Sequence, residues 1–150
     1  MVASTAMDSP RRLEWALNRC KEQGLRRTHA LLCALRAFAE APGPVSAAAL
    51  LTSPLIAGVF NRVTLYRILS RLESLGVLRK IGLNERSQHY VMPLPGEHHD
   101  YLVCTRCGHL ESSPLDCPLE DLNGRITRQT GFRVDRHDLV FWGRCGNCVE

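Results

Sequence analysis

The chain has 150 residues and a formal net charge of +4, and 45% of its residues are hydrophobic and 23% charged, which is typical of a folded globular protein. No stretch approaches the roughly 18 consecutive apolar residues that a membrane span needs, and no repeat or low-complexity tract is visible, so we expect no membrane partner. Lys and Arg outnumber Asp and Glu by 12 to 5 in residues 1–80, whereas residues 81–150 carry 7 against 10. This asymmetry predicts a module that faces a polyanion, followed by an acidic module able to hold cations.

Three short helices are predicted in the first fifty residues. Apolar residues at helical spacing indicate a helix over 10–23, which Gly24 closes. Thr28 is a good N-cap for a second helix that the sequence Pro-Gly-Pro at 42–44 stops, and Ser46 is predicted to cap a third helix over 47–51. Such a group of helices is typical of a small DNA-binding core.

A fourth helix is predicted from the N-cap Asn61 to Gly76, with one apolar face formed by leucines and Ile68. Its opposite face is polar and basic, and comprises Tyr66, Arg67, Ser70 and Ser74, with Arg62 and Arg71 towards the margins. A solvated face is the alternative interpretation, and the helix alone does not separate the two.

The segments 77–81 and 87–92 are predicted to form a hairpin with its turn at 82–85. Helices that end in a presenting helix followed directly by a hairpin indicate a winged helix-turn-helix, whose presenting helix enters the major groove of DNA. We therefore predict a winged-helix DNA-binding domain over 1–92 and a linker over 93–97, where prolines break regular structure and the charge balance changes.

Residues 98–150 are predicted to form a small α/β module, which gives the whole chain an α+β fold. Strands are expected over 98–104, from Leu110, and over 132–134 and 139–142. Pro118 is predicted to open a helix that Gly131 ends.

Two Cys-x-x-Cys pairs, Cys104 with Cys107 and Cys145 with Cys148, predict a structural Zn²⁺ site, because four thiolates match the tetrahedral sulfur coordination that zinc prefers. Disulfides are the first alternative, but the chain has seven cysteines and opens with no apolar secretory segment, so we expect cytoplasmic, reduced thiols. A redox dithiol is the second alternative, but Cys107 runs into an expected turn and strand rather than a helix.

Taken together, these residues resemble the ferric uptake regulator (Fur) superfamily of metal-responsive bacterial repressors, including its zinc-uptake-regulator members. The motifs that carry the resemblance are Gly24-Leu25-Arg26-Arg27-Thr28, Thr64-Leu65-Tyr66-Arg67, Leu75-Gly76, His98-His99-Asp100 and the two cysteine pairs. The resemblance implies a non-enzymatic homodimer with an N-terminal winged helix and a C-terminal dimerisation domain (98–150), which binds palindromic operators when its regulatory metal is loaded.

The resemblance also implies the DNA contacts. They map onto Tyr66 and Arg67 of the presenting helix and onto Arg26 and Arg27 before the second helix. Tyr66 can stack on a base or touch a thymine methyl, whereas an arginine can reach a guanine edge or a phosphate. The full predicted DNA-binding set is Arg26, Arg27, Arg62, Thr64, Tyr66, Arg67, Ser70 and Arg71.

A regulatory metal site is implied at His98, Asp100, Glu120 and His137. The i, i+2 spacing of His98 and Asp100 in a strand would turn both side chains to one face. The expected ion is Zn²⁺ or Fe²⁺, with zinc slightly favoured and Mn²⁺ and Ni²⁺ as further candidates. The alternative is that the histidines are ordinary surface residues. Cys117, before a helix, is interpreted as a cap-region or oxidation-sensitive thiol and is given no role.

A second regulatory site, which lies between the domains in many family members, departs from the family pattern here. His99 is present, but Tyr101 replaces the usual second histidine, and His89 is the nearest available donor. This weak site is either rebuilt around His89 and His99 or absent.

The sequence therefore predicts a cytoplasmic, homodimeric, metal-dependent repressor of metal homeostasis genes that binds double-stranded operator DNA. The alternatives are a peroxide-responsive regulator on the same scaffold and a zinc-stapled protein-interaction module. A thiol oxidoreductase or a metallohydrolase is disfavoured, because no general base stands beside an open metal position.

Overall fold

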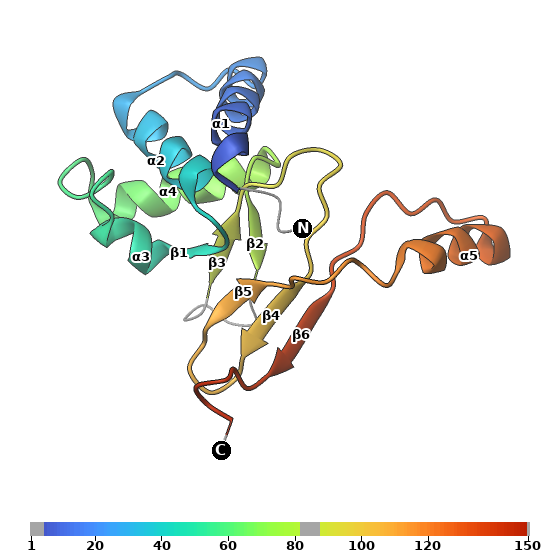
Figure 1. Cartoon of the computed structure of the whole chain (residues 1–150). Helices are drawn as coiled ribbons and strands as arrows, with labels where there is room; N and C mark the ends of the chain where they lie inside the picture. The colour runs from blue at the N-terminus through green and yellow to red at the C-terminus, as the bar shows by residue number, and fades with distance from the viewer. Residues whose placement is uncertain (1–4, 82–87, 150) are drawn as a thin grey trace. The chain divides into compact units, whose positions relative to one another are not determined.

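A computed structural model describes residues 5–81 and 88–149, with the side chains of residues 9–81, 88–119 and 121–149. The chain divides into two compact units, and the division falls between Glu97 and His98. Helices and sheets occur in both units, which confirms the predicted α+β fold (Figure 1). Among the described residues, no helix combines the length and the apolar character that crossing a membrane requires.

Four helices make up most of the described part of the first unit (Figure 1): α1 (Thr5–Glu22), α2 (His29–Glu40), α3 (Ala47–Thr52) and α4 (Arg62–Ser74). The helix α1 begins before the predicted residue 10, and the other helices start where the sequence predicts. Each of these starts is fixed by a side chain that accepts a backbone N–H three residues on, at 3.1 Å for Thr28, 3.1 Å for Ser46 and 2.9 Å for Asn61.

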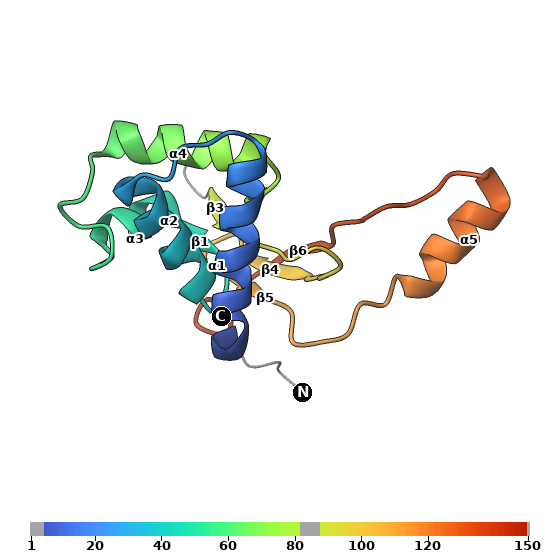
Figure 2. The ribbon, with the colours of Figure 1, turned by 90° about the horizontal axis from the view of Figure 1, so that it is seen from above.

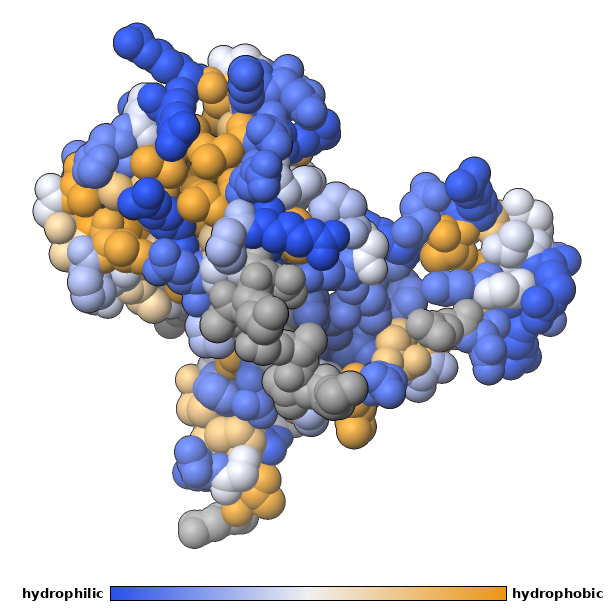
Figure 3. Space-filling model, turned by 45° about the horizontal axis from the view of Figure 1, so that its top comes forward, coloured by the Kyte–Doolittle hydropathy of each residue, from blue (hydrophilic) through white to orange (hydrophobic). Residues whose placement is uncertain are grey.

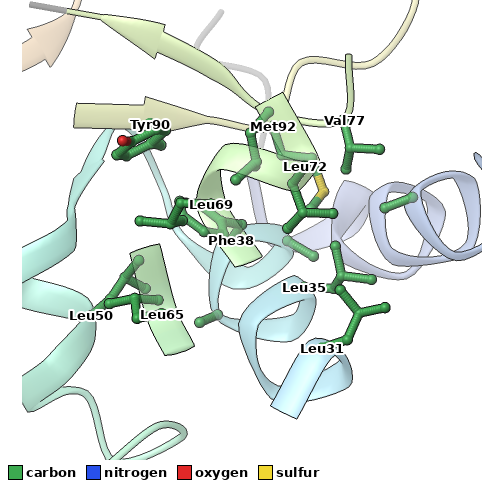
Figure 4. Packing of buried hydrophobic residues seen from close by; sticks show 14 of the residues in the cluster. Leu31, Leu35, Phe38, Leu50, Leu65, Leu69, Leu72, Val77, Tyr90 and Met92 are labelled. Atoms are coloured by element: carbon green, nitrogen blue, oxygen red, sulfur yellow. The ribbon is translucent and has the colours of Figure 1, made fainter. Parts of the chain in front are cut away.

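The core of the first unit is apolar and lies between α4 and the other helices (Figure 4). Leu65, Leu69 and Leu72 of α4 are all fully buried, as the predicted apolar arc required. Burying a leucine side chain contributes about 1.5–3 kcal/mol, so these three residues hold α4 in one rotational setting. The opposite face of α4 is thereby turned to solvent.

A three-stranded antiparallel sheet completes the first unit, with β1 (Val45–Ser46), β2 (Arg79–Ile81) and β3 (His89–Val91) in the order β1-β3-β2. The β2–β3 pair confirms the predicted hairpin strands, whereas the predicted turn at 82–85 lies outside the described residues. The helices followed by this hairpin have the winged helix-turn-helix arrangement. The strand β1 was not predicted, because two residues carry no periodicity.

The second unit contains β4 (Tyr101–Cys104), β5 (Leu110–Ser112), α5 (Glu120–Thr130) and β6 (Val140–Gly143). Its sheet has the order β5-β4-β6, in which β4 pairs antiparallel with β5 and parallel with β6. Both ribbon views show α5 standing apart from the strands on two extended connections (Figures 1 and 2).

The predicted strand over 132–134 is wrong. These residues belong to the irregular connection between α5 and β6, and Phe132 is 67% exposed. Alternating apolar and polar residues form a strand only when a neighbouring strand pairs with them, and no described strand pairs with this segment. The predicted end of the helix is confirmed, since Gly131 adopts a φ of 72°, where a residue with a Cβ is strained.

Candidate metal centres and nucleic-acid interface

The parallel pairing of β4 with β6 positions two clusters of potential metal ligands. Tyr101 lies opposite Val140 near the start of the strands, and Cys104 lies opposite Gly143 at their end. Because parallel strands run in the same direction, the segments before them meet at one edge of the sheet and the segments after them meet at the other. Side chains that are far apart in the sequence are thus brought together just outside the sheet.

The first cluster comprises the four predicted cysteines, which follow β4 and β6. The sulfur atoms of Cys104, Cys107, Cys145 and Cys148 all lie within 4.8 Å of one another, and those of Cys107 and Cys145 are 3.7 Å apart. In a tetrahedral zinc site with Zn–S bonds of about 2.3 Å, neighbouring sulfurs are about 3.8 Å apart. The residues present therefore fit a zinc ion held by four thiolates.

Backbone hydrogen bonds shape the turns that carry these sulfurs. The Gly108 N–H donates to the Cys104 carbonyl at 2.9 Å, and the Cys148 N–H donates to the Cys145 carbonyl at 2.8 Å. Gly108 has a φ of 76°, which explains why a glycine follows the first pair. The Cys145 N–H also donates to Sγ of Cys104 at 3.4 Å, so each turn contributes to the position of the other.

The thiols of Cys104 and Cys148 differ in their pKa. Backbone N–H groups, first that of Cys107 and then that of Cys145, lower the pKa of Cys104 to about 5. The hydrogen bond with the Cys145 thiol and then burial raise the pKa of Cys148 to about 12. Crowding thus opposes ionisation of all four thiols together, and a bound cation is what would make four adjacent thiolates stable.

The second cluster lies at the opposite edge of the same sheet, where β4 and β6 begin. One ligand atom each from His98, Asp100, Cys117 and His137 lies within 4.8 Å of the others. Asp100 is only 5% exposed, and its Oδ1 lies 2.6 Å from Nε2 of His98. The rings of His98 and His137 have centroids 4.3 Å apart. The donor set of two imidazoles, a carboxylate and a thiol is suited to a divalent transition metal.

Hydrogen bonds hold the side chains of the second cluster from outside. Nδ1 of His137 lies 3.0 Å from the side-chain amide of Asn123 on α5, while its Nε2 faces the sulfur of Cys117 at 3.1 Å. The Asp100 carbonyl accepts the Ser113 N–H at 2.7 Å, which ties the segment after β5 to the segment before β4. Three separate segments of the chain are thereby fixed around one point.

The structure brings together three of the four residues predicted for the regulatory site, namely His98, Asp100 and His137. The side chain of the fourth, Glu120, lies outside the described residues. Cys117 is the member of the cluster that sequence reasoning missed. The sequence could have indicated this residue, because Cys117 lies only three residues before Glu120, which was already predicted to be a metal ligand near the start of a helix.

The two histidines of the weak interdomain site lie in different units. His89 is on β3 of the first unit, and His99 precedes β4 in the second unit. A site formed by this pair stays a prediction.

The outward face of α4 forms a hollow of about 690 Å³ that is lined by Arg62, Val63, Tyr66, Arg67, Ser70, Arg71 and Ser74. Every wall comes from a single helix, so the hollow is a groove between side chains on a convex surface rather than a cleft that would enclose a small molecule. The guanidinium carbon of Arg62 lies 5.5 Å from the centroid of the Tyr66 ring. Figure 3 shows apolar patches among long hydrophilic side chains on the face of the helices turned towards the viewer.

The remaining predicted DNA-binding residues lie outside this groove. Arg26 and Arg27 are exposed in the segment between α1 and α2. Thr64 is half-buried and does not line the groove, and its backbone N–H donates to the Asn61 cap. Val63, which is 58% exposed, lines the groove although the sequence-based set omitted it.

Comparisons with known proteins agree with this arrangement. The model of the ferric uptake regulator family matches residues 60–142. The ferric uptake regulation protein of Bordetella parapertussis is 33% identical over 88 residues, which are 58% of this chain and 61% of that protein, and the protein of Legionella pneumophila is 35% identical over 86 residues, 57% and 61%. The chain therefore matches about three-fifths of the length of these curated relatives.

Two solved structures share the fold across most of both chains. The Helicobacter pylori ferric uptake regulator has a TM-score of 0.73 at 20% identity, covering 91% of this chain and 93% of that one. A zinc uptake regulator in complex with zinc and DNA has a TM-score of 0.57 at 24% identity, covering 93% of each chain. Since the family model spans more than half of its residues, the chain belongs to the ferric uptake regulator family.

Proposed function

We propose that this protein is a metal-dependent repressor that acts as a cytoplasmic homodimer and binds palindromic operator DNA. One observation carries the proposal: a unit with two clusters of potential metal ligands follows a winged helix whose α4 turns three arginines outward. The combination provides one surface for a polyanion and a separate site for an ion that controls it.

The four-cysteine cluster is proposed to hold a structural zinc ion. A bound ion would supply four metal–sulfur bonds that join the end of β4 to the end of β6. The second unit needs such a link, because few apolar side chains are buried among its described residues: Tyr101, Val103, Cys104 and Leu110.

The second cluster is proposed to hold the regulatory ion through His98, Asp100 and His137, with Glu120 as the further family ligand. Nitrogen and oxygen ligands exchange ions more readily than four thiolates do, which suits a sensor. The Helicobacter pylori regulator has three functional metal-binding sites, and the zinc uptake regulator was solved with zinc. We propose Zn²⁺ or Fe²⁺ as the sensed ion here.

The outward face of α4 is proposed to enter the major groove of DNA. Arg67 is exposed at the centre of this face and can reach a guanine edge or a phosphate, whereas Tyr66 offers a ring for a thymine methyl. The relative solved as a zinc and DNA complex shares this fold over most of its length. Arg26 and Arg27 are proposed to neutralise phosphates from the segment before α2.

Exposed apolar side chains of the second unit support a homodimer. Among the described residues, six of the eight exposed large hydrophobic side chains lie in this unit: Leu115, Leu122, Phe132, Phe141, Trp142 and Val149. A second copy of the unit would bury them. Sedimentation should show a dimer that Phe141→Glu weakens, and a wild-type protein that sediments as a monomer at high concentration would contradict this part of the proposal.

The switch is proposed to be a shift between populations. An ion that binds one arrangement of the dimer more tightly than others raises the fraction of molecules whose two winged helices are spaced for both half-sites. The three segments that meet at the second cluster are the part of the chain on which such an ion would act.

A selection experiment tests the proposal and identifies the operator at the same time. The purified protein, with one zinc ion per chain, selects DNA from a random duplex pool with and without added Zn²⁺ or Fe²⁺. We expect an inverted repeat to be enriched only with added metal, and Arg67→Ala to lose at least tenfold in affinity for it. Arg133→Ala, an exposed arginine of the second unit, is the matched control. Equal recovery of all sequences under every condition would overturn the proposal.

A further inference from the structure

Cys117 belongs to the second cluster by position, although the family resemblance supplies no role for it. It lies in the irregular segment between β5 and α5, and its Sγ is 3.1 Å from Nε2 of His137. That nitrogen is the ring atom of His137 that faces the cluster, because Nδ1 lies against the Asn123 amide. The sulfur therefore stands beside a proposed ligand atom of the regulatory site.

The spacing of the cluster is compatible with sulfur as one of four ligands. A tetrahedral ion with a sulfur ligand at about 2.3 Å and a nitrogen ligand at about 2.0–2.1 Å holds these two atoms about 3.5 Å apart. The sulfur and nitrogen here are 3.1 Å apart, and all four ligand atoms lie within 4.8 Å. Small movements of side chains would be enough to admit an ion between them.

The surroundings of the sulfur are those of a ligand group rather than of a core side chain. Sγ of Cys117 accepts the backbone N–H of Leu119 at 3.4 Å, which helps to hold the sulfur beside the histidine nitrogen. Cys20 shows the contrast, since it is 2% exposed in the apolar core of the first unit. Cys117 is instead half-buried among polar ligand atoms.

We propose that Cys117 is a ligand of the regulatory ion, so that the site consists of two imidazoles, one carboxylate and one thiolate and prefers Zn²⁺ to Mn²⁺ and Fe²⁺. The inference rests on the proposed function, which places the ion at His98, Asp100 and His137. A thiolate is a soft ligand that suits zinc, whereas a set of carboxylates suits manganese. Substituting Cys117 and Glu120 separately shows which of the two residues is the fourth ligand.

Cobalt spectroscopy reads the ligand directly. Full-length protein that retains one equivalent of zinc per chain is titrated with Co²⁺. The added Co²⁺ should not displace zinc from the four-cysteine cluster, because Zn²⁺ binds more tightly than Co²⁺. We expect one further equivalent of Co²⁺ to give visible bands of a tetrahedral site and a near-ultraviolet sulfur-to-cobalt charge-transfer band. Zinc analysis after the titration verifies that the first site has kept its ion.

The variants separate the ligands. Cys117→Ser should lose the charge-transfer band and at least tenfold in Zn²⁺ affinity, while Mn²⁺ affinity changes less, and Glu120→Gln should keep the band. Cys33→Ser is the matched control, because the Cys33 sulfur also lies near a histidine nitrogen, at 3.7 Å from His29, but belongs to the first unit and to neither cluster. One equivalent of Co²⁺ that binds the zinc-retaining wild-type protein without giving a sulfur band would overturn the inference, as would a band that survives Cys117→Ser.

Failure of the inference is distinct from failure of the proposed function. Operator binding that depends on added metal, in a protein whose second site shows no sulfur band, leaves the repressor intact and removes Cys117 from the site. A sulfur band in a protein that shows no metal-dependent DNA binding supports the ligand and removes the repressor.

Discussion

Arg12 and Glu97 form a two-pronged ion pair, in which Nη2 of Arg12 lies 3.2 and 3.1 Å from the two carboxylate oxygens of Glu97. The two side chains are only 13% and 24% exposed. The same carboxylate accepts the Leu94 N–H at 3.0 Å. The helix α1 is thus tied to the last residue of the first unit, immediately before His98 of the second cluster.

Removing this ion pair should destabilise the first unit measurably. We expect Arg12→Ala to lower the free energy of unfolding by about 1–3 kcal/mol, because the substitution removes two charge-assisted hydrogen bonds from a carboxylate that is only 24% exposed. Urea unfolding measures the effect. Glu22→Ala is the control, since it removes an exposed pair with Arg19 at 3.7 Å and should change stability by about 0.5 kcal/mol or less. Equal effects of the two substitutions would contradict the structural role given to Glu97.

Removing zinc from the four-cysteine cluster should unfold the second unit and spare the first. The second unit has a small core, whereas the core of the first unit is formed by four helices and a sheet. Each unit holds one of the two tryptophans, Trp15 and Trp142, so fluorescence of Trp15→Phe reports on the second unit alone. We expect a strong chelator, or Cys148→Ser, to abolish the cooperative transition seen by Trp142.

The control for this prediction is the complementary variant. Trp142→Phe leaves Trp15 as the reporter of the first unit, and its transition should be unchanged by the chelator. A cooperative transition of Trp142 that persists after complete removal of zinc would show that the second unit folds without the metal.

Local signals made most of the fold predictable. The caps Thr28, Ser46 and Asn61 were identified correctly because a cap depends only on the next three residues. The buried leucines of α4 were identified correctly because their helical spacing places them on one face. The strand β1 was missed for the opposite reason, since it exists only through pairing with β3.

In the second cluster too, some residues could be predicted from the sequence and one could not. His98 and Asp100 are in contact as predicted, although they precede β4 instead of lying in the predicted strand over 98–104, while His137 came from the family resemblance. The position of Cys117 depends on the path of an irregular segment after β5, which leaves no periodic trace in the sequence. The strand predicted at 132–134 failed because alternation was present but a partner strand was not.

Salt dependence should separate the two kinds of contact on α4. We expect Arg62→Ala to reduce the slope of log affinity against log salt concentration by about 0.9, as for one lost phosphate contact. Tyr66→Ala should weaken binding by about 1–3 kcal/mol without changing the slope, because a ring contact releases no counterions.

Titrations of the selected operator at salt concentrations from about 50 to about 200 mM test this prediction. Arg133→Ala should leave both quantities unchanged. The two roles would have to be reassigned if Tyr66→Ala changed the slope as much as Arg62→Ala. Arg62 also lies over the Tyr66 ring, so the double variant should lose less than the sum of the single effects.

Asn123 should control the metal affinity of the second cluster through His137. In the structure, Nδ2 of the Asn123 amide lies 3.0 Å from Nδ1 of His137. If Nε2 of His137 binds an ion, Nδ1 must carry the ring proton, and the amide of Asn123 must turn over so that Oδ1 accepts that proton. We expect Asn123→Ala to weaken Zn²⁺ binding at this site by about 10–100-fold, as is typical when the hydrogen-bond partner of a ligand histidine is removed. Asn123→Asp should preserve the affinity, because a carboxylate accepts the same proton.

Competition with a chromophoric chelator measures the Zn²⁺ affinity of the second cluster. Arg125→Ala, an exposed change on the same helix, serves as the control. If Asn123→Ala and Arg125→Ala bound Zn²⁺ equally well, Nε2 of His137 would not be a ligand atom, and the second cluster would have to hold its ion by other groups.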